Sequence, residues 1–164
     1  MIRKAIALIV ASVVFASSSI NVVSADNDTY ICKEYQEYIY EISEEYCVCP
    51  ELIMAIVERE SSGRADAENG GCKGLMQVSE KWHKDRMERL GVESLYDPYG
   101  NILVGTDYLM ELAERYGDIY AVLMVFNGTS NAVAKAEAGE YSSYATGIVE
   151  RSEQLERLHE KVGE

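Results

Sequence analysis

The sequence predicts a mainly α-helical fold with at most a small β-hairpin region near residues 64–76. Apolar residues recur at helical spacing over most of the chain. Glycines and helix-capping residues interrupt these stretches, and both prolines stand where a helix should begin. No segment shows a convincing long alternation of apolar and polar residues, which is the pattern of a half-buried strand.

The first 25 residues have the pattern of a secretory signal peptide. Arg3 and Lys4 precede an apolar run over residues 5–16, and residues 23–25 place small side chains where a signal peptidase reads them. Serines at 17–19 interrupt the run before it reaches the roughly 20 residues that span a bilayer. We therefore expect cleavage after residue 25, rather than an uncleaved anchor, and a secreted or cell-envelope protein without a membrane span.

The rest of the chain is long enough for one compact domain. We expect residues 26–49 to form an N-terminal helix and a cysteine-containing segment that pack onto the main domain, residues 50–164. The whole chain has a formal net charge of -13, and removal of the signal makes it more acidic still. Nucleic acid is therefore not an expected partner, because phosphate binding requires clustered positive charge. We expect a monomer.

All four cysteines, at positions 32, 47, 49 and 72, follow the signal segment. An even number of cysteines in an exported chain predicts two disulfides. A bridge between Cys47 and Cys49 would close a very short ring, so we expect one bridge from Cys32 and one to Cys72, each ending at Cys47 or Cys49. Neither histidine stands at zinc-ligand spacing from a cysteine pair, so no metal is expected.

The first two helices are predicted over residues 29–46 and from Pro50 to about Gly63. Tyrosine and isoleucine form one face of the first helix, and proline suits the first turn of the second. Glu60 continues the apolar stripe of the second helix, whereas Glu58 falls off it. Residues 64–73 are rich in turn formers and indicate an irregular loop or small hairpin.

The later helices are bounded by caps and glycines. Ser79 can cap a helix that Gly91 ends, and Asp97 with Pro98 begins a long helix that ends at Gly117. Three further helices are expected, over residues 118–126, 132–138 and 142–161. Trp82, the single tryptophan, is expected in the core.

Five short motifs follow one another between residues 60 and 145: Glu-Ser-Ser-Gly at 60–63, Gly-Leu-Met-Gln at 74–77, Asp-Pro-x-x-Asn-Ile-x-x-Gly at 97–105, Val-Phe-Asn-Gly at 125–128 and Glu-Tyr-Ser-Ser-Tyr-Ala at 140–145. Their order over about residues 50–150 resembles the catalytic domain of soluble lytic transglycosylases. These enzymes are relatives of goose-type lysozyme and cut the glycan strands of bacterial peptidoglycan. The resemblance implies a lysozyme-like helical domain, peptidoglycan glycan strands as substrate, and no cofactor.

Glu60 is the candidate catalytic residue, because a carboxyl partly withdrawn from water keeps its proton near neutral pH. The resemblance implies that Glu60 protonates the linkage between MurNAc and GlcNAc and then, as a base, takes the proton of the muramic acid 6-hydroxyl, which closes a 1,6-anhydro ring. The candidate substrate-binding residues are Ser61, Asn69, Gln77, Phe126, Asn127 and Tyr144.

The chain departs from the family pattern at several positions. Phe126 stands where the family usually has a tyrosine, Tyr141 replaces a threonine, and the loop looks one residue short, which leaves Asn69 as the nearest match to a sugar-contacting serine. Two alternatives therefore stay open. One is hydrolysis as in goose-type lysozyme, with Asp66 or Glu68 as second carboxylate. The other is a catalytically weak module that binds glycan or serves as a scaffold.

Overall fold

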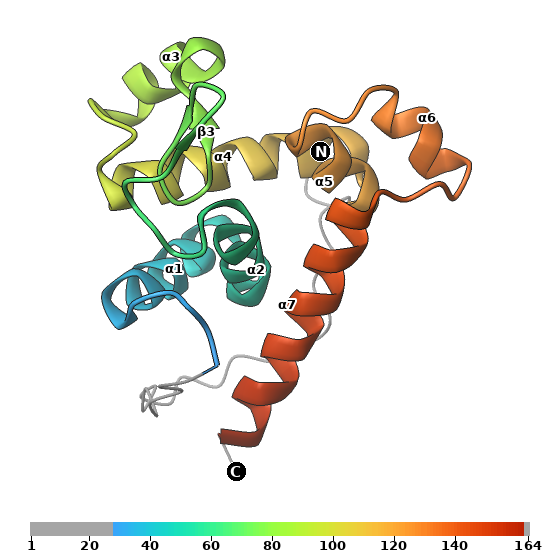
Figure 1. Cartoon of the computed structure of the whole chain (residues 1–164), viewed down its shortest axis with the longest axis horizontal. Helices are drawn as coiled ribbons and strands as arrows, with labels where there is room; N and C mark the ends of the chain where they lie inside the picture. The colour runs from blue at the N-terminus through green and yellow to red at the C-terminus, as the bar shows by residue number, and fades with distance from the viewer. Residues whose placement is uncertain (1–27, 163–164) are drawn as a thin grey trace, which may run out of the picture.

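The computed structural model describes residues 28–162, so the predicted signal peptide lies outside the described residues. The described part of the chain contains seven helices and one small sheet (Figure 1). The elements are α1 (Lys33–Tyr46), α2 (Pro50–Ser61), β1 (Glu68–Asn69), β2 (Cys72–Lys73), β3 (Val78–Ser79), α3 (Glu80–Leu90), α4 (Pro98–Tyr116), α5 (Ile119–Phe126), α6 (Ala132–Glu137) and α7 (Ser143–Val162). The mainly helical prediction is confirmed.

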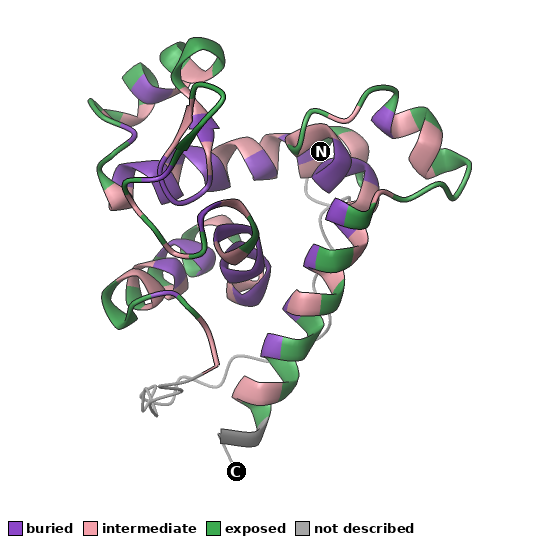
Figure 2. Ribbon diagram, in the orientation of Figure 1, coloured by how far each residue is buried: buried purple, intermediate pink, exposed green. Residues whose placement is uncertain are grey.

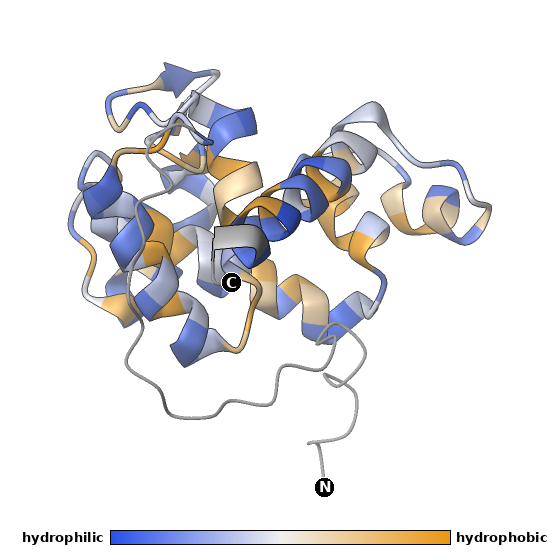
Figure 3. Ribbon diagram, turned by 90° about the horizontal axis from the view of Figure 1, so that it is seen from below, coloured by the Kyte–Doolittle hydropathy of each residue, from blue (hydrophilic) through white to orange (hydrophobic). Residues whose placement is uncertain are grey.

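Helix α2 lies at the centre of the helical layer. It packs against α1 on one side and α7 on the other, while α4 crosses beside α1 and α5 (Figure 1). Seven consecutive residues of α2, from Glu51 to Val57, are buried, and the buried positions of α7 face this helix (Figure 2). Hydrophobic and hydrophilic stretches alternate along the helices, as amphipathic packing requires (Figure 3). The core therefore surrounds the helix that carries Glu60.

Local capping chemistry accounts for several helix boundaries, above all those of α4. Asp97 Oδ2 accepts a hydrogen bond from Gly100 N at 2.8 Å, and Asp118 Oδ1 accepts one from Ala121 N at 2.8 Å. Gly91 and Gly117 end α3 and α4 with φ values of 70° and 68°, which glycine adopts without strain. These starts and stops agree with the predicted ones, but Ser79, although it precedes α3 as expected, makes no side-chain capping hydrogen bond.

The first helix begins later than predicted, at Lys33 rather than near Thr29. The preceding residues run across the end of α2 instead. A Cβ atom at Gly63 would lie 2.6 Å from the carbonyl oxygen of Tyr30, so only glycine allows this approach. The contact joins segments that are distant in sequence, so the local pattern of residues does not predict where α1 begins.

The sheet has the order β1-β2-β3 with antiparallel pairing throughout. Asn69 pairs with Cys72, and Cys72 pairs with Ser79, so these three side chains share one face. The hairpin expected near residues 64–76 is present, but a third strand extends it to Ser79. Gln77, with φ at 48°, turns the chain into this strand.

None of the four cysteines is disulfide-bonded in the structure, so the disulfides remain a prediction. The Cys49 thiol instead donates a hydrogen bond to Glu51 Oε2 at 3.1 Å. Within residues 28–162, no helix combines the length and apolar character that a membrane span requires.

Candidate active site

Glu60 lies in the last turn of α2, beside the start of the loop that leads to the sheet. The apolar face that precedes it is fully buried at Ile53, Ile56 and Val57. Glu60 itself is half-buried, because the helix end reaches the edge of the core. The predicted placement of this carboxyl at the end of a buried stripe is what the structure shows.

Tyr144, in the first turn of α7, contacts the candidate acid directly. Its hydroxyl donates a hydrogen bond to Glu60 Oε1, and the residue is only 8% exposed. The guanidinium carbon of Arg59 lies 5.9 Å from the centroid of the Tyr144 ring. A buried phenol and a nearby cation therefore surround one side of the carboxyl group.

These surroundings act on the pKa of Glu60 in opposite directions. Burial raises the pKa, while the hydrogen bond from Tyr144 and the positive charge of Arg59 lower it, and the net result is a raised pKa. Tyr144 has a strongly raised pKa, mainly because of burial and then because of the Glu60 charge, so it stays a neutral donor. Glu60 can thus hold a proton and can also be stabilised after losing it.

The polar candidates of the loop have mostly structural contacts. The Gln77 side-chain amide donates hydrogen bonds to the carbonyl oxygens of Ala67 and Gly74, at 3.0 and 2.9 Å, and so holds the loop closed. Ser61 is 3% exposed and donates to the Val57 carbonyl oxygen at 3.1 Å. The hydroxyl of Ser61 is therefore not open to a substrate in this structure.

The remaining candidates are accessible. Asn69 is exposed in β1, and Asn127 is exposed where α5 ends. Phe126 is half-buried and stacks on Tyr108 at a centroid distance of 5.5 Å. Tyr108 in turn lies 4.4 Å from the His83 ring, so Phe126 ends a row of rings that crosses α4.

A glycoside hydrolase generally needs a second carboxylate held near the acid, and the sequence offers Asp66 and Glu68. Asp66 and Glu68 are both exposed, and Glu68 accepts a hydrogen bond from the Tyr96 hydroxyl instead. The structure therefore gives no support to either residue as a partner of Glu60.

Sequence reasoning missed the role of Asn101, although a motif contains it. This fully buried side chain accepts a hydrogen bond from Met76 N at 2.8 Å and donates to the carbonyl oxygens of Lys73 and Leu95, at 2.8 and 2.9 Å. The segment of residues 74–77 is thereby fixed to α4. An asparagine amid apolar helix positions is the signal that could have revealed it.

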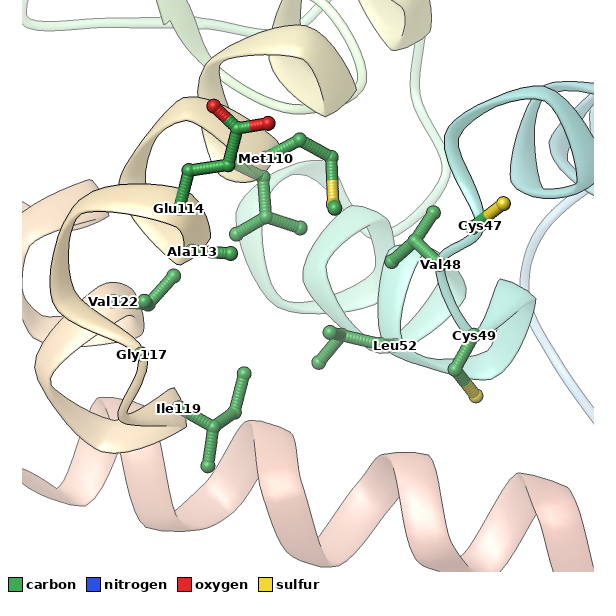
Figure 4. A pocket seen from close by; sticks show the side chains of 11 residues that line it. Cys47, Val48, Cys49, Leu52, Met110, Ala113, Glu114, Gly117, Ile119 and Val122 are labelled. Atoms are coloured by element: carbon green, nitrogen blue, oxygen red, sulfur yellow. The ribbon is translucent and has the colours of Figure 1, made fainter. Parts of the chain in front are cut away.

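A small apolar cavity of about 30 Å³ lies away from Glu60, between the junction of α1 and α2 and the facing parts of α4 and α5 (Figure 4). Its lining includes Val48, Leu52, Leu109, Met110 and Val122. This space holds only about one or two waters and is lined mainly by apolar side chains, so it does not make a ligand site.

The fold and the site together define a mainly helical domain in which a half-buried glutamate ends a buried helix and accepts a hydrogen bond from a buried tyrosine. The chain belongs to the Transglycosylase SLT domain family, whose model matches residues 37–148. The predicted resemblance is confirmed.

Three curated relatives share this region. A transglycosylase of Enterobacteria phage PRD1 is 36% identical over 99 residues, 60% of this chain. Membrane-bound lytic murein transglycosylase C of Serratia proteamaculans is 32% identical over 71% of this chain, and membrane-bound lytic murein transglycosylase E of Buchnera aphidicola is 32% identical over 60%. The chain spans 36%, 37% and 52% of the lengths of these relatives.

A solved structure shows the same fold. It is an inactive glutamate-to-glutamine variant of the lytic transglycosylase Slt from Pseudomonas aeruginosa, with a TM-score of 0.58 and 18% sequence identity. The match covers 74% of this chain and 24% of that one.

Proposed function

We propose that this chain is an exported enzyme that cleaves the β-1,4 linkage between MurNAc and GlcNAc in peptidoglycan, with Glu60 as its acid and base. The observation that carries the proposal is the half-buried Glu60 carboxyl, hydrogen-bonded by Tyr144. Glu60 also belongs to the Glu-Ser-Ser-Gly segment, which resembles the end of the family's catalytic helix. The names of the murein transglycosylase relatives support the substrate class and a cell-envelope location.

In the first step, protonated Glu60 donates its proton to the glycosidic oxygen, the bond from MurNAc C1 to that oxygen breaks, and GlcNAc leaves with a free 4-hydroxyl. Because an alkoxide is a poor leaving group, this proton transfer contributes roughly 10² to 10⁴ in rate. The raised pKa of Glu60 keeps the proton available.

In the second step, the Glu60 carboxylate takes the proton of the MurNAc 6-hydroxyl while that oxygen bonds to C1. The product is a 1,6-anhydro ring, and no water is consumed. The attacking oxygen belongs to the same sugar, so its effective molarity is high. The Tyr144 hydroxyl stabilises the carboxylate between the two steps.

The two alternatives have less support. Hydrolysis requires a positioned second carboxylate, or another way to hold the attacking water, and Asp66 and Glu68 are exposed. The residue that favours a binding-only module is Phe126, which lacks a hydroxyl. Tyr144 supplies a hydroxyl to Glu60 from another helix, so the phenylalanine does not leave the carboxyl without a partner.

Digestion of purified peptidoglycan, followed by mass analysis of the fragments, tests the proposal. We expect anhydro ends from the wild type and a loss of at least about 100-fold with Glu60→Gln. Glu88→Gln, which changes an exposed glutamate of α3, is the matched control and should cleave normally. Reducing ends would indicate hydrolysis, undiminished cleavage by Glu60→Gln would refute the site, and no cleavage by the wild type would favour the binding module.

A further inference from the structure

We propose that Arg151 is a positioning residue, which holds the Tyr144 hydroxyl on Glu60 by fixing α7 against α2 through Glu58. This inference rests on the proposed function of Glu60. It adds a residue outside every motif of the sequence, located two helical turns beyond Tyr144.

The contact between Arg151 and Glu58 is a two-pronged ion pair. Arg151 Nε lies 2.6 Å from Glu58 Oε2, and Nη2 lies 3.0 Å from Oε1. The two side chains are 27% and 8% exposed, so little water competes for the pair. Nη2 also donates to the carbonyl oxygen of Asp28, which holds the guanidinium plane from a third segment. Such a fork fixes orientation as well as distance.

The ion pair and the contact of Tyr144 with Glu60 both join α7 to the end of α2, although Glu58 and Glu60 point to different sides of α2. Glu58 and Glu60 are two residues apart at the end of α2, and Tyr144 and Arg151 are seven residues apart on α7, which places them on one face of that helix. A sliding or rotation of α7 that breaks the Glu58 contact therefore also displaces Tyr144. A third contact, between His159 Nδ1 and Glu51 Oε1 at 2.7 Å, continues this interface away from the site.

Arg151 acts through position rather than through its charge. The groups that face Glu60 are Tyr144 from α7, Arg59 from α2 and the Cys72 thiol from β2, whose pKa is raised by burial and by the Glu60 charge. Arg151 is not among the groups that shift the pKa of Glu60. The charge of Arg151 is also matched by Glu58, whose pKa stays low although burial alone would raise it.

The test is a measurement of the Glu60 pKa by carboxyl ¹³C NMR, which does not depend on activity. Tyr144→Phe removes a hydrogen bond to the carboxylate, so we expect the pKa to rise by about one unit. Arg151→Gln should also raise the Glu60 pKa, by about half of that shift or more. Arg151→Lys should bring the Glu60 pKa part of the way back to the wild-type value. Arg157→Gln, which breaks an exposed pair on the same helix, is the control and should change nothing.

The double variant Tyr144→Phe with Arg151→Gln decides whether the effect runs through Tyr144. We expect no shift beyond that of Tyr144→Phe alone. An additional shift in the double variant, an unchanged pKa in Arg151→Gln, or an unchanged pKa in Tyr144→Phe would each overturn the proposal. If Arg151→Gln does not fold, Glu58→Gln and Arg151→Lys provide the same comparison. Expected pKa shifts together with uncut peptidoglycan would refute the proposed function and leave the positioning role intact.

Discussion

The raised pKa of Glu60 suits its proposed role as an acid, but the same burial makes the charged carboxylate costly to stability. Its pKa in the folded chain is raised by burial, although Tyr144 and Arg59 offset part of the increase. The protonated form therefore fits the fold better than the charged form. The stability that the protonated carboxyl contributes is fully present below the pKa of Glu60 in the unfolded chain, roughly 4.3. It is lost as pH rises through the pKa of Glu60 in the folded chain.

Replacement of Glu60 by glutamine should consequently stabilise the protein at neutral pH. Glutamine stays neutral at every pH, so we expect the free energy of unfolding to rise by about 0.5–2 kcal/mol at pH 7 and to change little at pH 3. Urea unfolding of both proteins at the two pH values measures this. A destabilised Glu60→Gln at pH 7 would mean that the charged carboxylate is the better-accommodated form.

The same carboxyl should govern the pH profile of cleavage. Because the general acid must be protonated, kcat/KM should fall on an alkaline limb set by the raised pKa of Glu60. Initial rates on solubilised glycan strands, measured from about pH 4 to about pH 9, give kcat/KM along this alkaline limb. A rate that still rises at the upper end would contradict a general acid at this position.

Trp82 shows how a residue-scale expectation fails. The single tryptophan was expected in the core, yet it is 76% exposed beside Lys81, whose amine lies 4.9 Å from the ring centroid. Helix α3 buries only Met87, and His83, not Trp82, packs on Tyr108. We expect Trp82→Ala to change the free energy of unfolding by less than about 0.5 kcal/mol. If thermal unfolding showed that Trp82→Ala lowers the free energy of unfolding by several kcal/mol, the exposed position of Trp82 would be contradicted.

At the scale of elements, Asn101 joins α4 to the loop that carries Gln77. Asn101→Ala would leave Met76 N without its partner and deprive two buried carbonyl oxygens of a donor. We expect a loss of about 3 kcal/mol in the free energy of unfolding. Chemical denaturation measures it, with Asn127→Ala, at an exposed asparagine, as the comparison. Equal losses in both variants would contradict the role given to Asn101.

The sequence predicted those elements whose boundaries depend on nearby residues. Caps such as Asp97 and stops such as Gly117 act within one turn, so the pattern of residues specifies them directly. The start of α1 and strand β3 depend on contacts across the fold, at Gly63 and at Gln77. Glu60 and Tyr144 were identified because motifs contain both, whereas Arg151 stands in none. Ser61 stands in a motif, but the motif does not specify that its hydroxyl donates to the Val57 carbonyl oxygen of its own helix.

For the whole molecule, three carboxylates connect helices to one another: Glu51 and Glu58 join α2 to the distant α7, and Asp107 joins α4 to the neighbouring α3. Burial alone would raise the pKa of Glu51, Glu58 and Asp107, but hydrogen bonds and charges from His159, Arg151, Arg86 and Arg89 hold each pKa below its ordinary value. A lowered folded pKa contributes stability above the unfolded pKa and loses it as pH falls through the folded pKa. These contacts are therefore a source of acid sensitivity.

We expect the free energy of unfolding to fall by roughly 2 kcal/mol or more between pH 7 and pH 3, although the net negative charge decreases over this interval. Urea unfolding monitored by circular dichroism gives both values. In Glu58→Gln the decrease should be smaller, because one of the three carboxylates no longer titrates. An unchanged stability at pH 3 would show that these pairs contribute nothing to folding.

The hydroxyl that hydrogen-bonds Glu60 lies 84 positions further along the chain. A polypeptide that emerges from a ribosome or a translocation channel exposes the acid long before its phenol partner, and the two meet only when the last helix has docked. The proposed site is thus complete only at the end of folding, and a chain truncated before residue 144 carries Glu60 without the partner that lowers its pKa.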